Sequence, residues 1–168
     1  MSQLAYLPLP TDAVRALQKG APDAHGLPAE QAISDGSGLP CRHCLREIAA
    51  GERYLILSYR PFPAAQPYAE QGPIFLHAKA CEAYPTVRRL PEMVRNWEAV
   101  LLRGYDRRDR IVYGTGQTVP SAGVGATAAA LLARGDVAYL HARSATNNCY
   151  QFRIERVKRQ NPGGDCPG

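Results

Sequence analysis

The chain has 168 residues, of which 45% are hydrophobic and 21% are charged, and its formal net charge is +5. This length can bury a core without disulfide staples, and this composition excludes a disordered or fibrous chain. No apolar stretch approaches the roughly 20 residues of a membrane helix, and the first residues lack the basic start and apolar middle of a signal peptide, so we expect a cytoplasmic protein with no membrane partner.

The first half of the sequence is predicted to form one helix and four strands. Thr11 is predicted to cap a helix from Asp12 to about Lys19, which stops at Gly20. Gly, Pro and Asp residues predict an irregular connection over residues 20–40. Apolar residues that alternate or cluster predict the strands. These strands cover residues 4–9, 32–34, 53–62 and 73–78.

The second half is predicted to form two helices and two hairpins. Pro91 opens a helix over residues 91–100, and Ser121 is predicted to cap an alanine-rich helix over residues 122–134. The hairpins are expected over residues 101–119, turning at 106–109, and over residues 136–157, joined by Asn147–Asn148.

These elements predict a single α+β domain over residues 1–160, with a mostly antiparallel or mixed sheet and about three helices. Residues 161–168 are rich in Gly and Pro, so we expect a flexible tail with an exposed Cys166.

The cysteines predict a metal site. The chain has five of them, an odd number without an export signal, which argues against a disulfide framework. Two residues separate Cys41 from Cys44, and about thirty residues later three residues separate His77 from Cys81. Two such pairs supply the tetrahedral ligand set of zinc, and a closed set of three thiolates and one imidazole is structural rather than catalytic. We expect His77 and Cys81 on one helical turn, and His43 pointing away from the metal.

Two other interpretations of these residues compete with zinc. Cys44 and Cys81 are also small apolar residues suited to a core, with His77 as an ordinary strand histidine. Alternatively, Cys41 and Cys44 form a dithiol redox centre. The redox interpretation is less favoured because such a pair normally opens a helix after a strand, whereas this pair precedes a strand.

Four sequence segments, in this order along the chain, resemble the sequence pattern of one family. They are PCRHCLREIAAGERYLILSYRPF, PYAEQGPIFLHA, LLRGYD and YLHARSATNNCYQFRIER. Together they are similar to domain of unknown function 1203, a family of small bacterial proteins, over about residues 32–157. The resemblance implies a bacterial protein and assigns no activity.

The family pattern bears on the zinc hypothesis. It resembles this chain at Cys41 and Arg42 but often has serine in place of Cys44, and such members lack equivalents of His77 and Cys81. The resemblance therefore implies that a metal here is a structural addition in one branch of the family. Near the C-terminus the chain matches the pattern at His141, Ala145 and Cys149 and departs from it at Arg143, Ser144 and Asn148.

A second group of candidate residues lies on the C-terminal strands. Arg103 and Tyr105 share one face of their predicted strand, and His141 and Arg143 share one face of theirs. If the strands are neighbours, the arginines can hold a small anionic ligand and His141 can exchange protons with it. Cys41 and Cys149 are candidate nucleophiles if His141 lies within hydrogen-bond reach of them. The competing interpretation is the ordinary polar face of a half-buried strand.

Three functions remain open at this point. The first is a protein that binds a small anion, and the sequence does not decide whether it is an enzyme. The second is a zinc-stabilised interaction module for protein or nucleic acid. The positive charge is scattered, which argues against nucleic acid without excluding it. The third is a redox-responsive thiol protein.

Overall fold

The computed structural model describes residues 3–85 and 88–157, so Cys166 and the predicted tail lie outside the described residues. Within them the chain forms eight strands and three α-helices. The strands are β1 (Leu4–Leu7), β2 (Glu30–Ile33), β3 (Arg53–Tyr59), β4 (Gly72–His77), β5 (Ala99–Tyr105), β6 (Gln117–Pro120), β7 (Tyr139–Ser144) and β8 (Tyr150–Arg156). The helices are α1 (Thr11–Gln18), α2 (Glu92–Arg95) and α3 (Val124–Ala133), the last preceded by a 3-10 turn at Ser121–Gly123.

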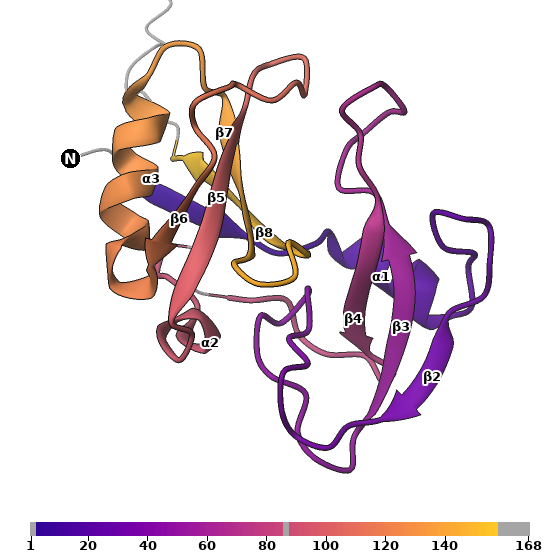
Figure 1. Ribbon diagram of the computed structural model, residues 1–168. Helices are drawn as coiled ribbons and strands as arrows, with labels where there is room; N and C mark the ends of the chain where they lie inside the picture. The colour runs from indigo at the N-terminus through magenta and orange to yellow at the C-terminus, as the bar shows by residue number, and fades with distance from the viewer. Residues whose placement is uncertain (1–2, 86–87, 158–168) are drawn as a thin grey trace, which may run out of the picture.

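The strands form two antiparallel sheets, which confirms the α+β class. The larger sheet has the order β1-β8-β7-β5-β6, and the smaller sheet has the order β2-β3-β4 (Figure 1). The chain starts in the larger sheet at β1, crosses to build the smaller sheet, and returns to complete the larger one. The smaller sheet is therefore an insertion between β1 and β5.

Each sheet is covered by one helix. Helix α3 packs on one face of the larger sheet, and α1 packs on the smaller sheet through Val14 and Leu17 (Figure 1). Burying an apolar side chain of this size contributes about 1.5–3 kcal/mol. The core beneath α1 also contains two of the cysteines, Cys41 and Cys44.

Both predicted helix caps are wrong, because tertiary partners use the two hydroxyl groups. The Oγ1 atom of Thr11 lies 2.9 Å from Nε2 of His43, and Oγ of Ser121 donates to the carbonyl of Trp97 at 2.6 Å. Neither α1 nor α3 has a side-chain cap. The stop at Gly20 is confirmed, since this residue has a positive φ of 96°.

Residues 91–120 differ from prediction in part. The helix expected over residues 91–100 is only four residues long, because Ala99 already begins β5 and Val100 is fully buried in the larger sheet. The turn at residues 106–109 is confirmed by Asp106, whose carboxylate accepts hydrogen bonds from two backbone N–H groups. The returning strand of this hairpin starts only at Gln117.

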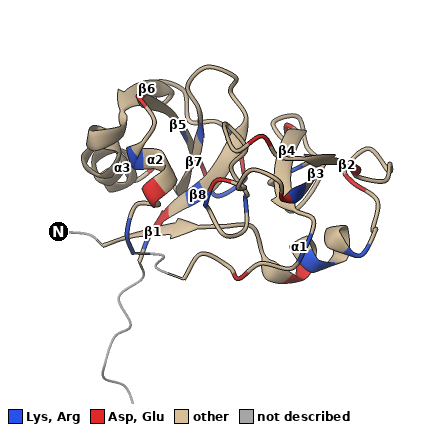
Figure 2. Ribbon diagram, turned by 90° about the horizontal axis from the view of Figure 1, so that it is seen from below, with Lys and Arg blue, Asp and Glu red and all other residues tan. Residues whose placement is uncertain are grey.

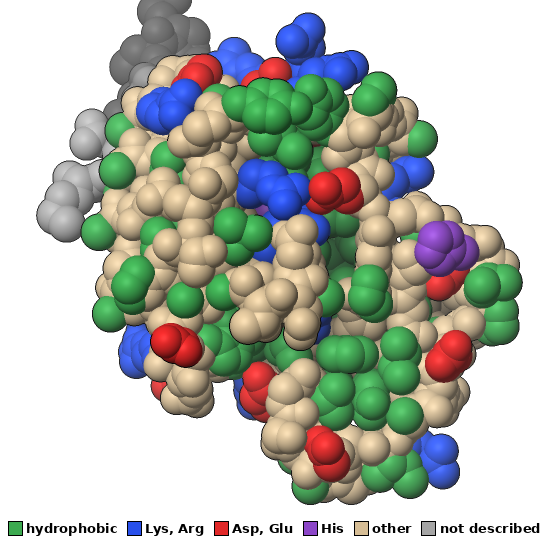
Figure 3. Space-filling model, in the orientation of Figure 1, with side chains coloured by type: hydrophobic (Ala, Val, Ile, Leu, Met, Phe, Trp, Pro, Cys, Tyr) green, Lys and Arg blue, Asp and Glu red, His purple; other side chains and the backbone are tan. Residues whose placement is uncertain are grey.

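Charged side chains are distributed without a continuous basic stripe on the faces shown. Lys and Arg lie in separate groups, with Asp and Glu among them (Figures 2 and 3). These views lend no support to a nucleic-acid interface. Among the described residues, every helix is too short or too polar to cross a membrane.

Candidate metal centre and adjoining cavity

The four residues predicted as metal ligands lie together. The donor atoms of Cys41, Cys44, His77 and Cys81 are all within 4.8 Å of one another. The sulfurs of Cys41 and Cys81 are 3.9 Å apart, and Sγ of Cys44 lies 3.6 Å from Nδ1 of His77. A tetrahedron with zinc bonds of about 2.3 Å to sulfur and 2.0 Å to nitrogen has edges of roughly 3.8 and 3.5 Å. The cluster thus has the donor set and spacing to hold a metal ion.

Two loops and one strand end supply these donors. Cys41 and Cys44 lie in a tight turn, closed by a 3.0 Å hydrogen bond from the backbone N–H of Leu45 to the carbonyl of Cys41. Leu45 adopts a positive φ of 53°, a conformation that this turn imposes on a non-glycine residue. His77 is the last residue of β4, and Cys81 follows in irregular chain. The expected helical turn for this pair is therefore wrong.

Helix α1 holds the irregular segment in place. Arg15 donates to the carbonyl of Cys81, and the amide of Gln18 donates to the carbonyls of His77 and Lys79 at 2.8 and 2.9 Å. These bonds satisfy backbone carbonyl groups at the end of β4 and in the segment that follows it. They orient the segment that carries two of the four donors.

His43 points inward, contrary to expectation. It is fully buried, its Nδ1 lies 3.2 Å from the sulfur of Cys81, and its Nε2 faces the hydroxyl of Thr11. Burial lowers the pKa of His43, which favours the neutral ring, and its two nitrogens then face the sulfur of Cys81 and the hydroxyl of Thr11. On the other side, Nε2 of His77 lies 3.4 Å from a carboxylate oxygen of Glu52. Such outer partners orient metal ligands.

Hydrogen bonds within the cluster shift the pKa values of its members in different directions, and hydrogen bonding to Cys41 raises the pKa of Cys44. Hydrogen bonds from Cys44 and then Cys81 lower the pKa of Cys41, which favours its thiolate. Hydrogen bonding to Cys41 raises the pKa of His77 to about 10. A metal ion would displace the proton from His77 and take its place beside the thiolate.

The second predicted group also lies together, because β5 and β7 are neighbours. Arg103 pairs with His141, and Leu101 pairs with Arg143, which puts the four candidate side chains on one face. Nη1 of Arg103 lies 2.9 Å from a carboxylate oxygen of Glu70, and Nη2 of Arg143 lies 3.3 Å from the same atom. The carboxylate of Glu70 thus forms ion pairs with both guanidinium groups.

The remaining members of this group are closed off from solvent. Tyr105 and His141 are at most 1% exposed, and they pack among Phe62, Tyr139 and Tyr150. Burial lowers the pKa of His141 well below 6.5, so the ring is neutral. The thiol of Cys149 donates to the carbonyl of Asn147 at 3.6 Å, and no hydrogen bond joins it to His141 in the described part of the chain. The catalytic role of this group stays a prediction.

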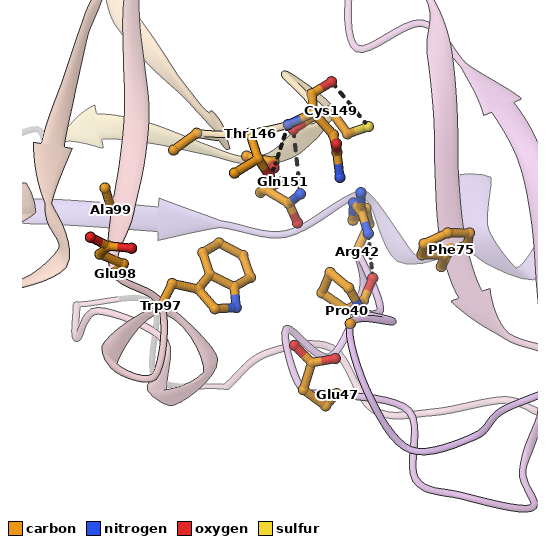
Figure 4. Close-up of a pocket in the computed structure, with 14 residues that line it drawn as sticks. Pro40, Arg42, Glu47, Phe75, Trp97, Glu98, Ala99, Thr146, Cys149 and Gln151 are labelled. Atoms are coloured by element: carbon orange, nitrogen blue, oxygen red, sulfur yellow. Dashed lines mark hydrogen bonds between the residues drawn. The ribbon is translucent and has the colours of Figure 1, made fainter.

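A cavity that sequence reasoning missed opens beside the metal cluster. We call it the Arg42 cavity. Its volume is about 360 Å³, and it lies between the turn that carries Arg42, the start of β5 and the β7–β8 loop (Figure 4). Its walls include Pro40, Arg42, Glu47, Phe75, Trp97, Glu98, Thr146, Cys149 and Gln151. A second cavity of about 310 Å³ shares Asn147 and Cys149 with it and is also lined by Arg143.

Two buried polar side chains face the Arg42 cavity. Arg42 is 2% exposed, and it donates to the carbonyls of Tyr150, at 2.7 Å, and Pro40. Burial lowers the pKa of Arg42 to about 10, so it stays charged at neutral pH. Gln151 is 3% exposed, and its Oε1 atom has no hydrogen-bond partner among the described residues.

A β-bulge positions Gln151. Phe152 pairs with Ala142 and Tyr150 pairs with Arg143, which leaves Gln151 as the extra residue of β8. Bulges re-aim side chains in this way. The only sequence signal for this region was the family pattern around Arg42 and Cys149.

Comparison with known proteins gives one match. A family model described as Protein of unknown function (DUF1203) matches residues 38–156, which is more than half of the chain. No curated protein and no solved structure matches the chain.

Proposed function

Because the chain belongs to the family described as Protein of unknown function (DUF1203), we propose its function from the geometry of its own residues. We assign it the role of a zinc-stabilised binding protein, in which one structural zinc ion fixes the wall of a ligand cavity. The observation that carries this proposal is the compact group of three sulfurs and one imidazole nitrogen.

The donor set favours zinc over other common metals. Three soft sulfurs and one imidazole nitrogen suit zinc, whereas calcium and magnesium require oxygen ligands. Two of the cysteines are buried, and His77 has a carboxylate partner in Glu52. A buried, fully protein-ligated ion has no open position for a substrate, so its role is structural.

The metal-bearing turn leads directly to the cavity. Arg42 lies between two residues of the cluster region, Cys41 and His43, and its side chain reaches the cavity wall. Its backbone N–H donates to the carbonyl of Phe75 at 3.1 Å, and its carbonyl accepts from the N–H of Leu9 at 3.0 Å. A metal ion that fixes the turn at Cys41 and Cys44 would therefore also fix the orientation of the Arg42 side chain.

Elemental analysis of the purified protein tests the metal. We expect close to one zinc ion per chain, and we expect the cobalt-substituted protein to have the intense visible absorption of a tetrahedral thiolate site. A folded wild-type protein that takes up neither zinc nor cobalt would refute the proposal. An octahedral cobalt spectrum would contradict a structural site, because it requires additional water ligands.

The redox alternative predicts a different result. Thiols held by zinc react slowly with a thiol reagent until a chelator removes the metal. A redox pair reacts at once and forms a reversible disulfide between Cys41 and Cys44. Mass spectrometry of the cysteines before and after chelation distinguishes these two roles.

A further inference from the structure

We propose that the Arg42 cavity binds a small zwitterion of the free amino acid class, with the ligand carboxylate at Arg42 and the ligand ammonium group at Gln151. This inference rests on the binding role proposed above and adds the chemical class of the ligand.

The buried guanidinium of Arg42 favours an anionic group on the ligand. Arg42 is 2% exposed, its guanidinium bonds only uncharged carbonyl oxygens, and no carboxylate of the described residues forms an ion pair with it. A buried charge normally has a partner of opposite sign, because removing it from water is unfavourable. The planar guanidinium suits a carboxylate, which it can bind with parallel hydrogen bonds.

The side-chain oxygen of Gln151 favours a hydrogen-bond donor on the ligand. Its amide nitrogen already donates to the carbonyl of Cys149 at 3.3 Å, whereas its oxygen is buried without a partner in the described chain. Leaving such an acceptor unpaired is unfavourable, because burial removes its hydrogen bonds to water without replacing them. An N–H group of a ligand would satisfy it.

The other charged groups of the cavity favour a ligand donor that carries a positive charge. Glu47 and Glu98 line the same space as Arg42 and Gln151, so the cavity also contains negative charge, with Glu47 below Pro40 and Glu98 beyond Trp97 in the view of Figure 4. A ligand that carried only negative charge would be attracted by Arg42 and repelled by these carboxylates. A ligand with one carboxylate and one ammonium group matches both signs.

Size and apolar walls restrict the ligand further. At about 360 Å³ the cavity is near the lower end of the range for small-molecule sites. Trp97, Phe75 and Pro40 give it flat apolar walls, and Figure 4 shows the indole of Trp97 on the opposite side from Phe75. These walls suit an apolar or aromatic ligand side chain.

Trp97 also provides the assay, because it is the only tryptophan in the chain. Its fluorescence is recorded while each standard free amino acid is added to the zinc-loaded protein. The same titrations are run with the matched amino acid amides, which lack the carboxylate, and the des-amino acids, which lack the ammonium group. We expect a saturable change with at least one apolar or aromatic amino acid, and affinities at least about tenfold weaker for both analogues.

A matched pair of variants tests the position of the site. Gln151→Leu removes the unpaired acceptor, so it is expected to weaken amino acid binding by about tenfold or more while leaving thermal stability unchanged or higher. Gln31→Leu makes the same chemical change at an exposed position of β2 and is expected to bind like the wild type.

Three results would overturn the inference. They are the absence of a saturable change with every amino acid, equal affinity for a des-amino acid, and wild-type affinity in Gln151→Leu. Zinc is measured in the same samples, which separates the two proposals. Zinc-loaded protein that binds no amino acid contradicts this inference alone, whereas amino acid binding by a metal-free protein contradicts the zinc proposal alone.

Discussion

Replacing Cys44 by serine removes one of the four donors that join two distant parts of the chain. The cluster links Cys41 to Cys81 and Cys44 to His77, which are 40 and 33 positions apart. A cross-link closing a loop of about 40 residues stabilises the folded state by about 4 kcal/mol through the entropy of the unfolded chain. This stabilisation is a lower bound, because an ion that binds only the folded chain adds its binding free energy to the free energy of unfolding.

The expected effect is large enough to measure by thermal unfolding. For a protein of this size each kcal/mol changes Tm by about 2–4 °C, so Cys44→Ser is expected to lower Tm by at least about 8 °C. Tm is measured by calorimetry, zinc is measured in the same samples, and the wild type is also unfolded after chelation. Cys149→Ser serves as the control, since it replaces a thiol outside the cluster.

The metal reasoning would be refuted by a Cys44→Ser protein that loses its zinc and keeps the wild-type Tm. It would also be refuted if chelation changed the Tm of the wild type and of Cys44→Ser by the same amount. In either case the cluster would not stabilise the fold through a bound ion.

Three further predictions concern other parts of the molecule. Thr11→Val removes the hydroxyl that bonds His43, and we expect metal affinity about tenfold lower in competition with a chromophoric chelator. Gly104→Ala would put a methyl group 2.9 Å from the hydroxyl oxygen of the buried Thr115, and we expect urea unfolding to show a loss of about 1–3 kcal/mol. Backbone hydrogen bonds lower the pKa of Asp23 below its ordinary 3.8, so the stability it contributes is present above that pH and lost as pH falls through the lower folded value. The Tm difference between the wild type and Asp23→Asn should therefore be larger at pH 7 than at pH 3, and an unchanged difference would contradict this reasoning.

The metal cluster could be predicted from the sequence because much of its information is local. A Cys-x2-Cys turn brings two sulfurs together by itself, and His77 and Cys81 are close in the chain. What spacing could not provide was the conformation of the second pair, which depends on hydrogen bonds from α1. It also could not predict His43, because an inward direction requires Thr11 as a partner from another element.

The Arg42 cavity could not be predicted in the same way. Arg42, Trp97 and Gln151 come from three separate segments, and only the packing of two sheets brings them together. A bulge in β8 further removes Gln151 from the simple alternation of a strand. The helix caps predicted at Thr11 and Ser121 are wrong for a related reason, since both hydroxyl groups fit the capping pattern in sequence but bond tertiary partners in the fold.

The insertion of the smaller sheet has a consequence for folding during synthesis. Among the described strands β1 leaves the ribosome before all others and its partner β8 after all others, and Leu4 pairs with Arg156. The cluster of Cys41, Cys44, His77 and Cys81, in contrast, needs only residues up to Cys81, so its four donors all emerge before four of the five strands of the larger sheet. The four donors can therefore come together before β8 is synthesised. During that time β1 has no partner strand and is exposed to chaperones.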